Sequence, residues 1–105
     1  MTAKIDALKR RLKEELLKSV SKDFISSPYD AIATVLWLLD DPQDYGIAIV
    51  PAGKLNRETI YLETKKRLHA YVDKYGIRSY SVSDALTDMF GIFEDLHVTV
   101  VDTRK

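Results

Sequence analysis

The stretch from Ser27 to Pro42, SPYDAIATVLWLLDDP, constrains the fold more than any other part of the sequence. Ser27 can cap a helix, Pro28 suits its first position, and Pro42 ends it. The apolar positions between these ends are Ile32, Val35, Leu36, Trp37, Leu38 and Leu39. They cover most of the helix circumference, and a helix that is apolar on nearly every side must be surrounded by other elements. We therefore predict that this helix lies at the centre of the core.

Three further helices are predicted from hydrophobic periodicity and from residues that favour helix ends. They are expected over residues 3–25, from Asn56 or Arg57 to Tyr75, and over about 81–90. Gly76 fits the left-handed residue that closes the third of the four helices. The fourth starts at Ser81 or Ser79, either of which can cap it.

Two segments rich in β-branched residues predict strands. They are YGIAIVPAG, residues 45–53, and LHVTVV, residues 96–101. Unbroken apolarity from Ile47 to Val50 favours burial on both faces of the first strand. The predicted fold class is α+β, with four helices packed on a small, two- to three-stranded sheet in the order α-α-β-α-α-β. A chain of 105 residues predicts a single domain, residues 1–105.

The first helix carries a leucine stripe that allows two interpretations. Its apolar positions follow three- and four-residue steps at Ile5, Leu8, Leu12, Leu16 and Val20, and Leu17 and Phe24 widen the stripe. The stripe can pack against the core of its own domain. It can also form the seam of a homodimer, although a coiled coil normally needs three or four heptads and this helix offers two. A homodimeric protein-interaction module is therefore one functional hypothesis.

Composition excludes several classes of protein and site. There are no cysteines, which excludes disulfides, thiol catalysis and cysteine-ligated zinc. Gln43 and Asn56 are the only amide side chains, a scarcity that predicts a thermophilic source because amides are heat-labile. The apolar run from Ala31 to Leu39 is too short to span a bilayer, and the first 15 residues lack the apolar block of a signal peptide. A cytoplasmic protein without a membrane partner is expected.

The charges balance overall but are unevenly distributed. Sixteen basic residues stand against 16 acidic ones, and global neutrality does not favour binding to phosphate backbones. Basic residues are in excess in residues 1–23 and 53–78, and acidic residues in 24–52 and 79–105. The two basic segments could still form one basic face.

The segment YVDKYGIRSYSVSDAL, residues 71–86, has the spacing of a helix-turn-helix. Gly76 permits a sharp turn, Ile77 can plug the core, and Val82 and Leu86 form a buried pair four residues apart. In these positions the segment resembles the helix-turn-helix superfamily of DNA-binding regulators. With LHVTVV as a wing strand, it also resembles the winged-helix variant. The alternative is that Gly76 only caps one helix before an ordinary second helix begins.

The resemblance implies a recognition helix over residues 78–90 and a small DNA-binding protein that acts as a transcriptional regulator. The residues that the resemblance implies to contact DNA are Arg78, Ser79, Tyr80, Ser83 and Thr87. The basic segment before the motif adds Lys65, Lys66 and Arg67 as candidate phosphate contacts. Two positions depart from the family pattern. Val72 stands where the family has a small residue, and at 100° per residue Asp84 points away from the core with Tyr80 and Asp88 beside it. That face presents carboxylates to a polyanion.

No residue pattern indicates catalysis, a cofactor or a small-molecule ligand. His69 and His97 lie on a helix and on the outer face of a predicted strand, without the spacing of a metal site. Asp40, Asp41 and Asp44 precede the first strand, and Glu94 and Asp95 precede the second. These five carboxylates could bind a divalent cation if both strands start at the same end of the sheet. A phosphate-binding loop and a recognisable nucleophile are both lacking, so the protein is not expected to be an enzyme.

Overall fold

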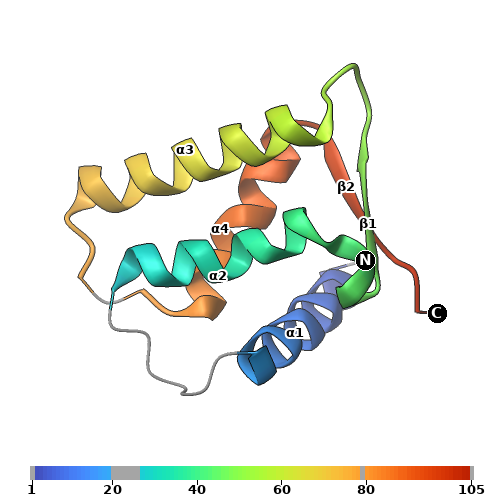
Figure 1. Cartoon of the computed structure of the whole chain (residues 1–105), viewed down its shortest axis with the longest axis horizontal. Helices are drawn as coiled ribbons and strands as arrows, with labels where there is room; N and C mark the ends of the chain where they lie inside the picture. Colours follow the sequence, from blue (N-terminus) through green and yellow to red (C-terminus); the bar gives the residue numbers. More distant parts are fainter. Residues whose placement is uncertain (1, 20–26, 79, 105) are drawn as a thin grey trace.

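The computed structural model describes residues 2–19, 27–78 and 80–104 (Figure 1). Its elements are α1 (Thr2–Ser19), α2 (Pro28–Asp40), the short 3-10 helix η1 (Pro42–Tyr45), β1 (Ile47–Pro51), α3 (Arg57–Tyr75), α4 (Val82–Asp95) and β2 (Val98–Asp102). The order of helices and strands is α-α-β-α-α-β, and the α+β fold class is as predicted. Residues 20–25 of the predicted first helix lie outside the described residues.

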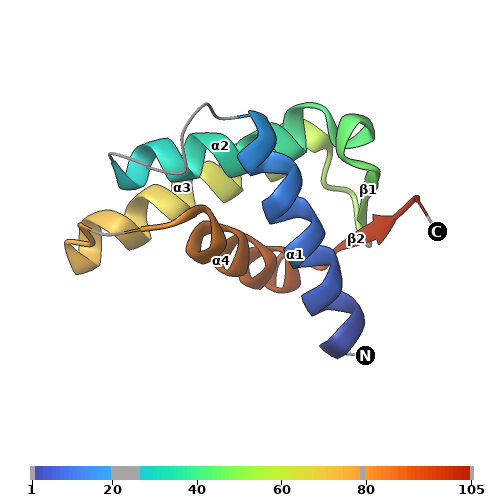
Figure 2. The same cartoon turned by 90° about the horizontal axis from the view of Figure 1, so that it is seen from below.

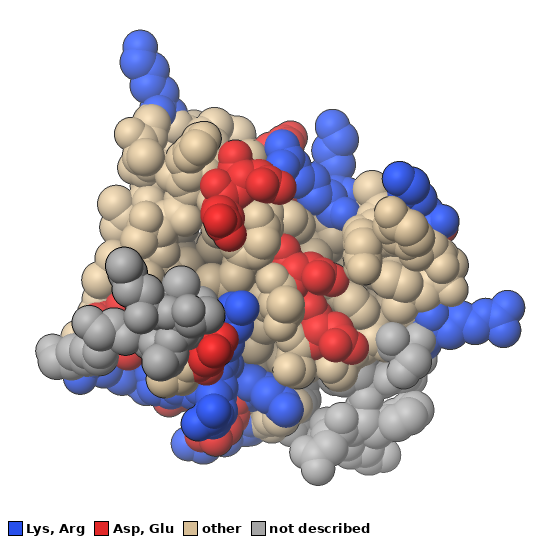
Figure 3. All heavy atoms as spheres, turned by 180° about the vertical axis from the view of Figure 1, so that it is seen from behind, with Lys and Arg blue, Asp and Glu red and all other residues tan. Residues whose placement is uncertain are grey.

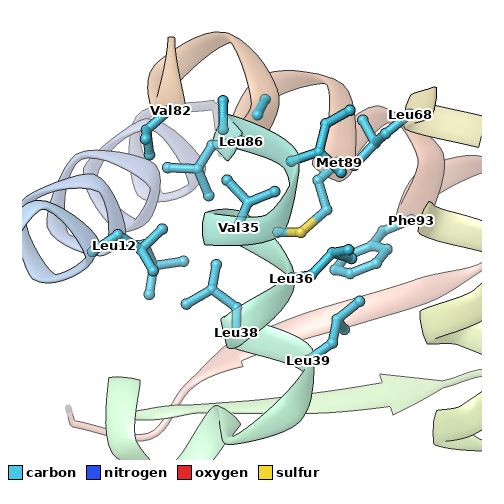
Figure 4. Packing of buried hydrophobic residues seen from close by; sticks show 14 of the residues in the cluster. Leu12, Val35, Leu36, Leu38, Leu39, Leu68, Val82, Leu86, Met89 and Phe93 are labelled. Atoms are coloured by element: carbon cyan, nitrogen blue, oxygen red, sulfur yellow. The ribbon is translucent and has the colours of Figure 1, made fainter. Parts of the chain in front are cut away.

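Helix α2 occupies the centre of the core, as its sequence predicts. Its buried side chains are Ala31, Ile32, Thr34, Val35, Leu36, Leu38 and Leu39. The helix contacts α3, α4 and η1, and α3 and α1 lie on opposite sides of the α2–α4 pair (Figures 1 and 2). Figure 4 shows Leu12 of α1 and Phe93 of α4 directed toward α2 from different sides. Neighbours thus cover most of the apolar circumference, and the side that carries Ala33 and the half-buried Trp37 is left toward solvent.

The leucine stripe of α1 packs against this core. Leu8, Leu12 and Leu16 are all buried and belong to the same hydrophobic cluster as α2. The core-packing interpretation of the stripe is therefore confirmed for these three leucines, whereas Val20 and Phe24 lie outside the described residues. A homodimer remains a prediction, and it would need a surface other than these leucines.

Three of the predicted helix ends, at Ser27, Asn56 and Gly76, are confirmed by the structure. The Ser27 hydroxyl accepts from the Tyr29 N–H at 3.1 Å, and Asn56 Oδ1 accepts from the Thr59 N–H at 2.8 Å. Gly76 closes α3 in the left-handed conformation, with φ 57° and ψ 39°. A residue with a side chain adopts that conformation only under strain, so glycine suits this position.

The sheet has two strands, paired antiparallel with Ile47 opposite Asp102 and Pro51 opposite Val98. Ile47 and Val98 are buried against the core, whereas 46% of Val50 and 43% of Val101 are exposed. The prediction that the first strand is buried on both faces is therefore wrong. Helices cover only one face of this sheet, and alternate side chains along each strand point to the other.

Arg11 joins α1 to the turn that precedes β1 and to the last residue of β2. Its guanidinium donates to the carbonyls of Tyr45 and Gly46 at 2.7 and 3.2 Å, and to Asp102 Oδ1 at 3.1 Å. Arginine suits this role because its planar group presents several donors in a fixed geometry. The contacts fix the direction of α1 across the domain, and this direction positions the basic residues described next.

Candidate nucleic-acid interface

Helix α4 begins later and ends later than the predicted recognition helix. Ser81 is its N-cap and Val82 its first residue, and the helix continues to Asp95. Arg78 is exposed and precedes the helix, and Ser79 lies outside the described residues. The prediction of a recognition helix over residues 78–90 is therefore wrong at both ends, whereas the start predicted with Ser81 as the cap is confirmed.

The prediction that Tyr80 contacts DNA is also wrong. Only 7% of its surface is exposed, and its ring belongs to the core cluster. Its hydroxyl donates to Asp88 Oδ2 at 2.5 Å. Burial, and then this hydrogen bond, raise the pKa of the Tyr80 phenol far above its usual value. The side chain is therefore occupied inside the fold, whereas the sequence analysis placed it on the outer face toward DNA.

The remaining surface of α4 divides into two flanks. At 100° per residue, Ser83 and Thr87 lie on one side of the buried stripe and Asp88 and Ile92 on the other. Helix α1 crosses α4 on the first flank (Figure 2), and the Lys9 ammonium lies 5.4 Å from the centre of the Phe90 ring. Helix α3 lies along the second flank. Ser83 thus faces α1 and Asp88 faces α3, whereas Thr87 lines the surface beside both helices.

A groove of about 260 Å³ separates α1 from the hydroxyl flank of α4. We call it the α1/α4 groove, and its lining residues are Asp6, Lys9, Arg10, Lys13, Ser83, Leu86 and Thr87. Three of these side chains are cationic and one is anionic, so the groove is basic. Its hydroxyls and cations are groups that contact phosphate oxygens in protein–DNA complexes. Of the residues predicted to contact DNA, Ser83 and Thr87 meet here.

The cations of α1 were not among the predicted site residues. The sequence has an excess of basic residues in residues 1–23, but hydrophobic periodicity cannot show which helix packs beside α4. Lys13 is four residues after Lys9 and three after Arg10, so the three cations share one face of α1. This spacing indicates a basic face on α1, and the structure shows that this face lies beside α4.

The cations predicted on α3 lie elsewhere. Lys65, Lys66 and Arg67 are all exposed, and Arg67 Nε pairs with Glu63 at 3.4 Å. Lys65 and Lys66 do not line the α1/α4 groove. Because α1 and α3 lie on opposite sides of α4, the two basic segments do not form one continuous basic face. Figure 3 shows acidic side chains across the middle of one face of the molecule and basic ones toward its edges.

The carboxylates considered for a cation site are separated. The strands are antiparallel, so the start of β1, near Asp44, lies at the opposite end of the sheet from the start of β2. Glu94 and Asp95 belong to the last turn of α4, and the described residues contain no group of three metal-ligating side chains. His97 does not lie in a strand either: it has a φ of 58° in the turn before β2.

Comparisons with known proteins add no relative. No family model matches the chain, and no curated protein or solved structure matches it significantly. None of the described helices combines the length and the apolar character needed to cross a membrane. Any functional conclusion therefore rests on the geometry of the chain itself.

Proposed function

We propose that the protein binds duplex DNA, with the α1/α4 groove on the phosphate backbone. The observation that carries the proposal is the position of Lys9, Arg10 and Lys13 beside Ser83 and Thr87, the two hydroxyls on the outer surface of α4. Cations that neutralise phosphates supply most of the affinity of non-specific DNA binding. Hydroxyls add hydrogen bonds to phosphate oxygens and fix the register. Ser83 is the candidate for this contact, because the Thr87 hydroxyl already donates to the Ser83 carbonyl at 3.1 Å.

The resemblance to the helix-turn-helix superfamily also points to α4 as a helix that contacts DNA. Gly76 adopts the left-handed turn, Ile77 packs against the core, and Val82 and Leu86 are buried. These are the roles that the helix-turn-helix resemblance assigns to them. On this proposal α1 and the flank of α4 that carries Ser83 and Thr87 approach the duplex, and the flank that carries Asp88 faces away from it.

The test is binding of mixed-sequence duplex fragments, measured by fluorescence anisotropy over a range of salt concentrations. Arg10→Ala combined with Lys13→Ala should weaken binding and should make the negative slope of log K against log salt shallower by about 2, because two phosphate contacts are lost. Lys9 is left unchanged because it also packs on Phe90.

Lys65→Ala combined with Lys66→Ala is the matched control. It removes the same charge from exposed positions on α3. The control should keep the wild-type slope. Equal losses in the two double variants would show diffuse electrostatic attraction without a defined groove, and a wild-type protein that binds no duplex at low salt would remove the proposal.

A further inference from the structure

A second groove separates α4 from α3 and has the opposite character. This α3/α4 groove has a volume of about 520 Å³ and is lined by Arg67, Leu68, Tyr71, Thr87, Asp88, Gly91, Ile92, Glu94 and Asp95. Three carboxylates stand against one guanidinium, and that guanidinium already pairs with Glu63. The groove therefore attracts cations and repels phosphate.

The apolar part of the α3/α4 groove includes exposed aromatic surface. Tyr71 is 43% exposed and its ring lies 5.0 Å from that of Tyr75, which is 62% exposed. Ile92 is half-buried on the facing side of the groove. Tyrosine is enriched where protein surfaces meet, because a large rigid ring gives contact area at low entropic cost. The groove thus combines an apolar lining with acidic side chains.

Gly91 provides an independent observation. It lies inside α4, where glycine costs about 0.5–1 kcal/mol relative to alanine. A Cβ at this position would meet nothing within 4 Å, so the packing of the chain does not require glycine. Glycine in the groove lining instead leaves the α4 backbone open to close approach by another molecule.

We propose that the α3/α4 groove binds a basic amphipathic helix of a partner protein. Its apolar face would lie on Tyr71, Ile92 and the bare backbone at Gly91, in the manner of helices that dock into grooves. Its lysine and arginine side chains would meet Asp88, Glu94 and Asp95. The inference does not depend on DNA binding, because Thr87 is the one residue common to both grooves.

The probe is a synthetic 16-residue peptide of leucine and lysine with leucines at helical spacing. Binding is measured by calorimetry and mapped by amide chemical shifts in ¹⁵N-labelled protein. We expect saturable binding with shifts confined to residues 67–71 and 87–95. A peptide with glutamate in place of lysine should not bind, and a scrambled peptide of the same composition should bind less. Shifts centred on the α1/α4 groove, or no saturable binding, would overturn the proposal.

Gly91→Ala separates a partner site from a structural role. The variant should unfold at a higher denaturant concentration, because alanine favours the helix, yet bind the peptide about tenfold more weakly. Gly53→Ala is the matched control, since its Cβ also meets nothing within 4 Å and it lies outside the groove. Unchanged peptide affinity in Gly91→Ala would contradict the proposal, as would self-association in sedimentation that the peptide reverses, since a second copy would then be the occupant.

Discussion

Ser81 and Asp84 cap the first turn of α4 reciprocally. The Asp84 N–H donates to Ser81 Oγ at 3.1 Å, and the Ser81 N–H donates to Asp84 Oδ2 at 3.2 Å. Asp84 is exposed, as its helical position predicts, but its carboxylate satisfies a backbone donor. It also lies near the positive end of the helix dipole, where a negative charge is stabilising. An exposed residue without contacts contributes little to stability, whereas the capping hydrogen bond lets Asp84 stabilise the start of α4.

Replacing Asp84 should therefore destabilise the protein. We expect Asp84→Ala to lower the free energy of unfolding by about 1 kcal/mol, since a cap hydrogen bond and a favourable charge are both lost. Asp84→Asn should lose less because it keeps an acceptor. Asp95→Ala, which removes a carboxylate from the opposite end of α4, serves as the control and should be neutral or slightly stabilising. Equal urea midpoints for Asp84→Ala and wild type would refute the structural role.

The Tyr80–Asp88 contact predicts alkaline sensitivity. Burial and the carboxylate raise the pKa of Tyr80 above its unfolded value of 10.0, so the folded state holds this proton more tightly. The stabilisation is fully present below about pH 10 and is lost as the pH rises above that value. Urea unfolding from pH 8 to 11 should show a shallower decline in Tyr80→Phe than in wild type. Tyr75→Phe, on an exposed ring, should follow wild type; a Tyr80→Phe profile parallel to wild type would contradict the assignment.

The helix ends could be predicted because they depend on neighbouring residues. Ser27, Asn56 and Gly76 each satisfy or close a helix through groups within a few positions in sequence. The central place of α2 was also predictable, since an apolar circumference has to be covered whatever covers it. The α+β fold class follows from such local signals taken in order.

The candidate site was only partly predictable, because it depends on which elements become neighbours. Ser83 and Thr87 were identified from their positions on α4, but Lys9 and Lys13 enter through the packing of α1 against it. Tyr80 was placed on the surface because the helix was expected to begin earlier. The five carboxylates were predicted to gather only if both strands start at the same end of the sheet. The strands are antiparallel, and hydrophobic periodicity does not reveal strand direction.

Two buried threonines differ in one hydrogen bond. Thr34 Oγ1 donates to the Asp30 carbonyl at 2.8 Å, one helical turn earlier in α2. Thr64 Oγ1, on the buried side of α3, has no partner among the described residues. A buried hydroxyl without a partner loses its hydrogen bonds to water and gains none in return. Thr64 therefore weakens the core at a position where a methyl group would fit.

Thr64→Val should stabilise the protein by about 1 kcal/mol, because valine has nearly the same shape and removes the unsatisfied hydroxyl. Thr34→Val makes the same chemical change at a bonded site, so it should give no gain or a small loss. Both variants are compared with wild type by urea unfolding at pH 7. The sign of the difference between them is decisive: if Thr34→Val proves as stable as Thr64→Val or more so, the Thr64 hydroxyl is hydrogen-bonded in solution.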